Sequence, residues 1–485
     1  MANRQSISVN NLKRMTRNDL ISCLSRIDDI FDFFTALARY VKDNDGACTN
    51  YNSWINKPDI KRINDRIRVG MRALRSELKE KDVKNFIDFW EKNISTYIND
   101  IALFCLCTLL LFDGQDNDLI SDTGTCIIGP LSTDKNMTNM VLYPSPPISF
   151  QQTYFDSKNM HEGRNTIKAN PSDALSALKR YTFIPLSELG DYTTFIHRYT
   201  PNIKVTDKDL IVAISPIRNQ RWFNINYDDD NNTFSCNYTD KKLNETINNN
   251  ICKVIDAAAK AGVNILAFPE MIMNKETEDY VKTHIFNNPE ISNNIIMIAL
   301  GTLWNDNKNE GCLLSGTGSV LWRGKKRIRY DHYDKEQNKN YREDLRDVDG
   351  PLYMLDVEGI GRICWEICRD CLAQEIDMIY QRLGANLYII SAYSSSLDEM
   401  INKVKGYGLQ NGAISLTANY CFCNENNNDA RRGFVYIPQV HGKLLTEMNP
   451  PYCMQKQCAK MECDNQPCAW KCTINKELQY EFEEL

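Results

Sequence analysis

Apolar residues follow two different periods along the chain. In the first part they recur every three or four positions among charged residues, over 30–41, 60–78 and 82–112. That spacing places the apolar side chains on one face of a helix. We therefore predict a mainly helical domain over residues 1–113.

Short apolar runs bounded by glycine, proline or asparagine dominate from residue 205 onward. They include Asp209–Pro216, Val263–Phe268, Tyr353–Val357, Gly384–Ala392, Ile414–Asn419 and Gly433–Pro438. Runs of this length are typical of buried strands, and Ile251–Ala261 between the first two has helical spacing. Alternating strands and helices indicate an α/β domain, which we place at 205–450.

The two remaining segments have different compositions. Residues 114–204 are rich in Gly, Ser, Thr, Asn and Pro and predict an irregular linker, or a segment that wraps the α/β domain. Residues 451–485 form a cysteine-rich tail with Cys453, Cys458, Cys463, Cys468 and Cys472. Zinc sites usually bring cysteines in closer pairs, so zinc binding and a tail of free thiols both stay open.

Charge and hydropathy exclude several classes of protein. A net charge of -6 argues against a general nucleic-acid-binding surface. The motif Tyr227–Asp230 matches the magnesium-binding pattern of reverse transcriptases, but it lies in an Asn/Asp-rich loop without the flanking strands of a palm domain. The longest apolar run, 101–112, is shorter than the ~20 residues of a membrane span and predicts a buried helix.

The 18 cysteines bear on the cellular compartment. The chain starts with polar residues and lacks an early apolar core, so no signal peptide is expected. We expect a cytoplasmic protein with reduced thiols.

Three segments carry candidate chemistry. Ile363–Glu366 reads Ile-Cys-Trp-Glu, and the apolar run before it predicts a strand that ends at the thiol of Cys364. A thiol there becomes a nucleophile when an acid or base lies nearby, because a free cysteine with a pKa of about 8.5 is mostly protonated at neutral pH. Glu270, after Ala-Phe-Pro, and Lys335, after Tyr-Asp, are the candidate partners.

The order Glu270, Lys335, Cys364 and the flanking strands resemble the nitrilase superfamily of carbon-nitrogen hydrolases over about residues 205–450. The resemblance implies an α/β/β/α sandwich and a Glu-Lys-Cys triad. Glu270 would accept the thiol proton, while the Lys335 ammonium and the N–H of Trp365 would stabilise the oxyanion. An amide or a nitrile would then react through a thioester or thioimidate.

The lysine position has an alternative. A register without gaps from Gly324 places His332 in the lysine position, whereas the register of Lys335 places Glu343 where some relatives carry a further glutamate. After the cysteine, many relatives continue with Pro-Glu, and this chain does not. Glu366 and Arg369 are substrate-site candidates, and an internal ion pair is the other interpretation of Arg369.

Two functions from different classes remain. One is a cytoplasmic amidase or nitrilase that acts on a small molecule without a cofactor. The other is a nitrilase-like scaffold or regulatory module with little or no hydrolase activity, similar to the domains that occur beside reverse transcriptases in bacterial phage-defence proteins. The resemblance also implies a homo-oligomer. The net charge and the short apolar runs predict no nucleic-acid or membrane partner.

Overall fold

The computed structural model describes four main stretches of the chain. They are residues 14–113 except 28, 50, 56, 74–79 and 95–99; residues 126–128, 140–147, 150, 175 and 178; residues 181–421 except 190–191, 204, 206–207, 218–222, 239–240 and 335–336; and residues 432–438 and 468–485. The chain divides into two compact units, the first mainly within residues 1–193 and the second mainly within 194–485.

The first unit is mainly helical, as the apolar periodicity predicts. Its helices are α1 (Arg17–Leu24), α2 (Ile30–Asp43), α3 (Tyr51–Trp54), α4 (Pro58–Ala73), α5 (Glu80–Ile94), α6 (Ile101–Asp113) and the short α9 (Leu186–Leu189). The strands β2 (Met140–Pro144) and β3 (Tyr181–Pro185) form an antiparallel pair in the same unit.

Helix α6 lies at the centre of this unit. It is apolar on nearly every face, and its residues pack with those of α2 and α5 in one core. The buried Trp90 indole donates a 2.8 Å hydrogen bond to Thr108, which satisfies the polar group of each side chain. The apolar run that is too short to span a membrane is therefore a buried helix.

The second unit contains two seven-stranded sheets among its described residues. The first sheet has the order β1 (Cys126–Ile128), β4 (Thr194–Tyr199), β14 (Leu352–Val357), β15 (Gly361–Ile367), β16 (Leu387–Ala392), β17 (Ile414–Asn419) and β18 (Gly433–Tyr436). The second has the order β11 (Val320–Lys325), β10 (Lys308–Ser315), β9 (Met297–Asn305), β8 (Ile265–Ala267), β5 (Leu210–Ile214), β19 (Trp470–Ile474) and β20 (Tyr480–Glu484).

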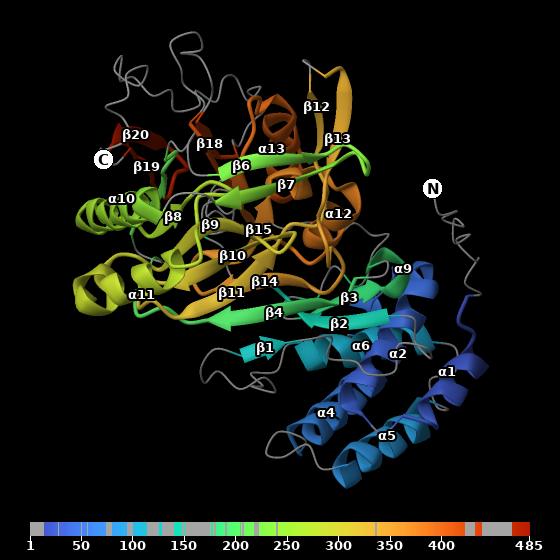
Figure 1. The fold of residues 1–485 in the computed structure, drawn as a ribbon. Coiled ribbons are helices and arrows are strands. Elements are labelled where there is room, and N and C mark those ends of the chain that lie inside the picture. The colour runs from blue at the N-terminus through green and yellow to red at the C-terminus, as the bar shows by residue number, and fades with distance from the viewer. Residues whose placement is uncertain are drawn as a thin grey trace. The chain divides into compact units, whose positions relative to one another are not determined.

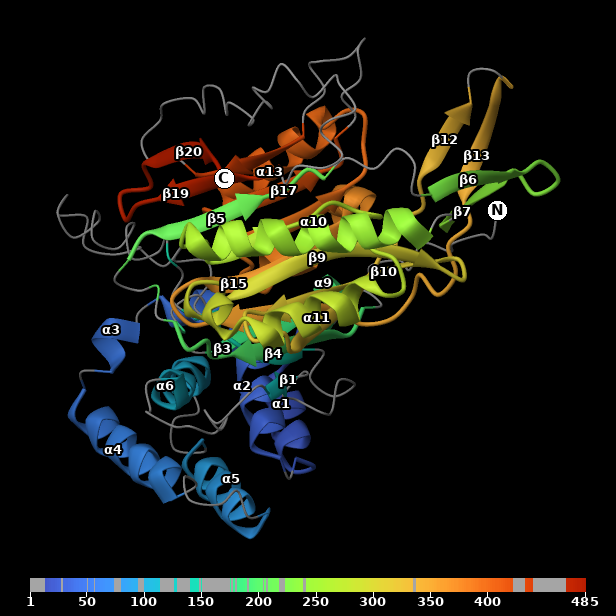
Figure 2. The same cartoon turned by 60° about the vertical axis from the view of Figure 1, so that its left-hand side comes forward.

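The two sheets face each other and helices cover their outer sides (Figure 1). Trp365 of β15 lies directly over Gly311 and Gly324 in the opposite sheet, where a Cβ atom would stand 2.7 and 3.0 Å from its ring. Helices α10 (Lys241–Lys260) and α11 (Thr277–Asn287) run side by side along the second sheet (Figure 2). Helices α12 (Gln374–Arg382) and α13 (Asp398–Asn411) pack against each other, and α13 contacts strands β17 and β18 of the first sheet. The predicted α/β/β/α sandwich is confirmed.

The central strands are buried on both faces, which explains their unbroken apolar character. Every residue of β15, β16 and β17 is buried, and the three strands pair in parallel. In the other sheet, β8 pairs in parallel with β5 and β9. Residues that follow β8 and β15 are thus positioned by rigid, fully paired strands.

Two predicted boundaries differ from the structure. The predicted linker 114–204 contains β4, which pairs in parallel with β14 and belongs to the sandwich. The predicted tail contains β19, which pairs with β5, and β20. Long-range pairing of this kind leaves little trace in a local sequence pattern.

A smaller sheet stands at one end of the sandwich (Figures 1 and 2). It has the order β12 (Asp331–Asp334), β13 (Lys339–Glu343), β7 (Thr233–Tyr238) and β6 (Phe223–Asp228). Its two hairpins come from distant parts of the sequence, and we call it the cap sheet. The motif Tyr227–Asp230 ends β6 and enters the turn of the first hairpin. None of the helices among the described residues is long and apolar enough to cross a membrane.

Candidate active site

Glu270 is held in a tight turn immediately after β8. Its backbone N–H bonds to the carbonyl of Ala392, and the next residue, Met271, has a left-handed φ of 62° with its N–H on the Thr302 hydroxyl at 2.8 Å. Gly301 allows this turn, because a Cβ atom there would lie 2.2 Å from the carbonyl oxygen of Pro269. The turn directs the Glu270 carboxylate into the protein, where it is 1% exposed.

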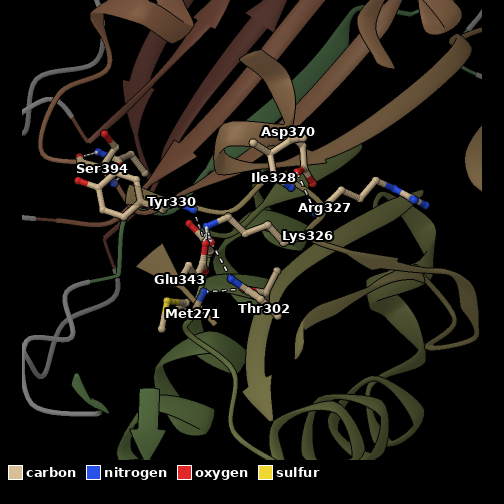
Figure 3. Close-up of polar contacts among 12 residues, drawn as sticks. Met271, Thr302, Lys326, Arg327, Ile328, Tyr330, Glu343, Asp370 and Ser394 are labelled. Atoms are coloured by element: carbon tan, nitrogen blue, oxygen red, sulfur yellow. Dashed lines mark hydrogen bonds and ion pairs between the residues drawn. The ribbon is translucent and has the colours of Figure 1, made fainter. Parts of the chain in front are cut away.

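Lys326 follows the edge strand β11 and reaches the same carboxylate. Its Nζ lies 2.9 Å from Glu270 Oε1 and 2.9 Å from Glu343 Oε2, and all three side chains are 2–3% exposed. Asn309 of β10 donates a further 2.7 Å hydrogen bond to Glu270 Oε1. Figure 3 shows the Lys326 side chain extended toward Glu343. One ammonium group thus joins two buried carboxylates.

Charge compensation holds this cluster together. Burial alone would lower the pKa of Lys326, but Glu270 and Glu343 outweigh it and raise that pKa well above its ordinary value. Burial raises the pKa of Glu343, and Lys326 opposes this effect. The lysine is therefore a permanent cation at neutral pH. Glu343 also accepts a 2.9 Å hydrogen bond from the N–H of Tyr330.

Cys368 is the thiol that belongs to this cluster. Strand β15 continues to Ile367, and Cys368 follows it with a left-handed φ of 52°. Burial is the first cause that raises the pKa of its thiol, and the Glu270 carboxylate is the next. Lys326 and a hydrogen bond from the backbone of Tyr393 lower it. The raised pKa keeps the thiol protonated at rest, and Glu270 is the carboxylate that acts on it most strongly.

Cys364 lies elsewhere, which corrects the sequence-based choice of nucleophile. It stands in the middle of β15, opposite Tyr388 of β16, and is fully buried. Burial and then Glu366 raise the pKa of its thiol, and the other charges that act on it are Arg362, Asp377 and Asp356. The sequence interpretation ended the strand three residues too early. The thiol that follows the end of the strand is that of Cys368.

The lysine assignment also changes. Lys335 lies outside the described residues, and the ammonium that contacts Glu270 is that of Lys326. His332 stands in β12 of the cap sheet, where its ring stacks on that of Tyr227. Glu343 does join the cluster, seventeen positions after its lysine rather than eight. Lys326 directly follows β11, a position that the sequence analysis did not single out.

Two remaining candidates lie on β15, on opposite faces. Trp365 points between the sheets, and its indole donates to Ser391 at 3.0 Å. The backbone N–H of Trp365, predicted to follow the nucleophile, does not follow Cys368. The residue directly after Cys368 is Arg369. Glu366 is 2% exposed, and neither of its carboxylate oxygens has a hydrogen-bond partner among the described residues. Burial and then Asp377 and Asp370 raise its pKa well above the ordinary value, so it is protonated.

The candidate zinc ligands fall into two groups. Cys453, Cys458 and Cys463 lie outside the described residues, whereas Cys468 is half-buried and Cys472 is buried in β19. Within the described part of the chain, no group of three or more His, Cys, Asp and Glu side chains has the geometry of a metal site.

Asp370 locks the lysine segment to the turn that carries Cys368. Its Oδ1 accepts hydrogen bonds from the backbone N–H groups of Arg327 at 2.9 Å and Ile328 at 2.8 Å, as Figure 3 shows. Burial nevertheless raises the pKa of this carboxyl from 3.8 to about 7, and the two N–H groups oppose the increase. The folded protein therefore holds a proton on Asp370 that the unfolded chain releases at lower pH.

This raised pKa predicts a stability difference between wild type and Asp370→Asn. A carboxyl whose folded pKa is raised contributes stability that is fully present below pH 4 and is lost as the pH approaches 7. The difference between 3.8 and about 7 corresponds to roughly 4 kcal/mol. The amide keeps the acceptor oxygen but does not titrate. Urea denaturation between pH 4 and 8 should show a steeper loss of stability in wild type, and parallel curves would refute this account.

Comparisons with known proteins do not reach family level. No family model matches the sequence, and no curated protein has a similar sequence. Among solved structures, the amidase from Nesterenkonia sp. AN1 is 13% identical, with 57% of this chain and 90% of that chain covered at a TM-score of 0.33. A mutant of an amidase from Nesterenkonia AN1, described as from the nitrilase superfamily, is 12% identical. The match covers 57% of this chain and 90% of that chain at a TM-score of 0.35.

A second protein from this comparison is the C. elegans NitFhit protein, which is 13% identical. The match covers 57% of this chain and 60% of that chain at a TM-score of 0.35. Scores this low carry no argument about function. The case for chemistry therefore rests on the buried cluster itself: a carboxylate, a permanent cation and a protonated thiol at the ends of three strands.

Proposed function

We propose that this protein is a cysteine-dependent hydrolase of non-peptide carbon-nitrogen bonds, with Glu270 as base, Lys326 as oxyanion stabiliser and Cys368 as nucleophile. One observation carries the proposal. The thiol of Cys368, in a left-handed turn after β15, is electrostatically coupled to a buried carboxylate that is itself ion-paired to a lysine at 2.9 Å. A thiol, a base and a fixed cation are the groups that acyl transfer needs.

The first half of the reaction forms an acyl-enzyme. Glu270 takes the proton from the Cys368 thiol as sulfur attacks the amide carbon, and the carbonyl electrons move onto oxygen. The Lys326 ammonium, with the backbone N–H of Arg369, stabilises that negative charge. As the carbonyl reforms, the C–N bond breaks and Glu270 returns the proton to the leaving nitrogen. Ammonia or an amine departs and a thioester remains.

The second half regenerates the thiol. Glu270 takes a proton from water as the water oxygen attacks the thioester carbon, and Lys326 again stabilises the oxyanion. Collapse breaks the C–S bond, and the proton on Glu270 returns to sulfur, so a carboxylic acid leaves. A nitrile would instead add the thiol across its C≡N bond to give a thioimidate. One water would convert this to the thioester with loss of ammonia, and a second water would release the acid. No step requires a cofactor.

The resting state of the thiol decides how it is activated. Burial and Glu270 raise the pKa of Cys368, so few molecules hold a thiolate before substrate binds. Deprotonation must then accompany attack, with Glu270 as general base. An enzyme of this kind loses activity when the base is removed even though the cysteine is intact.

One observation favours the alternative function of a scaffold or regulatory module. Glu270, Lys326 and Cys368 are 1%, 4% and 4% exposed, so the described residues leave the reactive groups closed to solvent. A module without substrates has no need of an opening. Turnover measurements separate the two functions directly.

Ammonia release tests the proposed function. Wild type should hydrolyse members of a series of short aliphatic amides and nitriles, and Glu270→Gln should lower kcat by about 1,000-fold, within the range expected for a lost general base. The glutamine keeps an oxygen for the bonds from Asn309 and Lys326 but cannot take a proton. Glu358→Gln, the same change at an exposed turn, is the matched control.

The results distinguish the two functions. Activity in wild type and in Glu358→Gln, together with its loss in Glu270→Gln, supports the hydrolase. Absence of ammonia release from every amide and nitrile, by a protein whose folding is confirmed by circular dichroism, supports the scaffold.

A further inference from the structure

The cap sheet packs against one side of the candidate active site, next to the turn that carries Glu270. Phe234, Cys236 and Tyr341 of the cap sheet pack in one cluster with Met271, the residue after Glu270, and with Trp304. The thiol of Cys236 is buried, and its pKa responds to Glu343, Glu270 and Lys326. This side of the cluster is therefore filled by apolar side chains, and substrate must approach from another direction.

The side of the cluster that faces solvent is formed by Tyr330 and Arg369. Tyr330 is 39% exposed, although its N–H is tied to Glu343. Burial raises the pKa of its phenol, as does the nearby Cys368 thiol, whereas Arg369 and Lys326 lower it. The Tyr330 side chain thus lies against the guanidinium group, and the candidate nucleophile acts on its phenol electrostatically. Figure 3 shows Tyr330 beside the bond between Lys326 and Glu343.

The Arg369 guanidinium lies over the Tyr330 ring, with its central carbon 5.7 Å from the ring centre. It is half-buried and forms no hydrogen bond or ion pair with any residue of the described part of the chain. The internal ion pair of Arg369 with Asp370, considered from the sequence, does not form, because Asp370 instead accepts from the N–H groups of Arg327 and Ile328. An arginine held by stacking keeps its five N–H donors available for a planar anion.

The neighbouring carboxylates are bound by groups other than Arg369. Glu270 and Glu343 share the Lys326 ammonium, and Asp370 is held by the N–H groups of Arg327 and Ile328. A desolvated cation without a partner costs free energy, and a bound anion removes that cost. Because Arg369 directly follows Cys368 in sequence, an anion bound there would belong to the substrate whose carbonyl meets the thiol.

We propose that Arg369, stacked on Tyr330, binds a carboxylate of the substrate, so that the preferred substrates are short amides that carry a negative charge near the scissile bond. This inference rests on the proposed function and adds the substrate class. The ring contact holds the guanidinium group over Tyr330 and leaves its N–H donors open to a two-pronged contact with a carboxylate.

The test compares matched substrates. Butyramide is succinamate with its carboxylate replaced by a methyl group, so the ratio of their kcat/KM values isolates the charge. Wild type should prefer succinamate, and Arg369→Gln should lower that ratio by about 30-fold, while Arg369→Lys should keep part of the preference. Malonamate and glutaramate, one carbon shorter and longer, report where the carboxylate is held.

Arg342→Gln is the matched control for charge. Arg342 stands on β13 of the cap sheet and is already paired with Asp331 at 3.3 Å, and both side chains are about 60% exposed. Arg342→Gln should change the ratio of kcat/KM for succinamate to that for butyramide by no more than about twofold, because exposed charges are screened. An equal fall in both variants, or an unchanged ratio in Arg369→Gln, overturns the inference and leaves the hydrolase standing.

The inference remains testable if the proposed function fails. Should no amide be hydrolysed, isothermal calorimetry with succinamate replaces the kinetic ratio. Binding to wild type that Arg369→Gln abolishes then supports an anion site in a protein that is not a hydrolase. Equal binding to both proteins, or none to either, rejects the site.

Discussion

Cys368→Ala should abolish amide hydrolysis, with a fall in kcat of about 10,000-fold or more, because the acyl-enzyme cannot form without the sulfur. Cys368→Ser should be nearly as inactive. A serine hydroxyl is a much weaker acid than a thiol, and Glu270 alone is a weak base for it. Steady-state ammonia release measures both variants. Peptide mapping by mass spectrometry after a brief reaction should find the acyl group on Cys368 in wild type.

Two other buried thiols provide the controls. Cys364 lies four residues earlier on the same strand but among Glu366 and Arg362, so Cys364→Ala should retain wild-type kcat. Cys236 is the more demanding control, because Glu270 and Lys326 act on its thiol as well. If Cys236→Ala or Cys364→Ala removed activity and Cys368→Ala did not, the assignment of the nucleophile would be wrong.

The fold was largely predictable from the sequence. The central strands are buried on both faces, so their apolar runs stand out, and β8, β16 and β17 lie within the predicted segments. Strands β4, β19 and β20 were missed. β4 includes His197 and Arg198, and β20 carries three exposed glutamates, so neither is a continuous apolar run. Their pairing with β14 and β5 is decided by tertiary contacts.

The candidate site was predictable only in part. Pro269-Glu270 follows a clear strand, so the sequence locates this carboxylate correctly at a strand end. The sequence analysis ended the strand at Cys364, two residues before the charged Glu366. Its side chain is buried and protonated, so β15 continues past it to Ile367. A residue of a charged type can therefore lie within a buried strand when burial favours its neutral form.

The lysine shows a different limit of sequence analysis. Lys326 is one of two consecutive lysines followed by two arginines among the next three residues, a pattern typical of a solvated surface. Only the fold reveals that Lys326 is 4% exposed whereas Lys325 is half-buried. The carboxylate partners that make burial possible come from positions 56 residues before and 17 residues after it.

Lys326→Met should damage both activity and stability. Removal of the cation leaves Glu270 and Glu343 buried without their ammonium partner, which costs about 3–5 kcal/mol for broken buried ion pairs. It also removes an oxyanion donor, which predicts a fall in kcat of roughly 100- to 1,000-fold. Urea denaturation and ammonia release measure the two losses separately. Lys325→Met, the same change one residue earlier, forms the control, because Lys325 has no ion pair within the described residues.

The pH dependence and a second substitution identify the cause of the instability. Without Lys326, both carboxylates must take up protons to stay buried, so their folded pKa values rise and the stability deficit should grow as the pH increases from 5 to 8. Adding Glu343→Gln removes one of the two charges and should recover part of the lost stability, but none of the activity. A deficit that is constant with pH and unaffected by Glu343→Gln would mean that Lys326 stabilises the fold by packing alone, and the charge-compensated cluster would no longer explain the site.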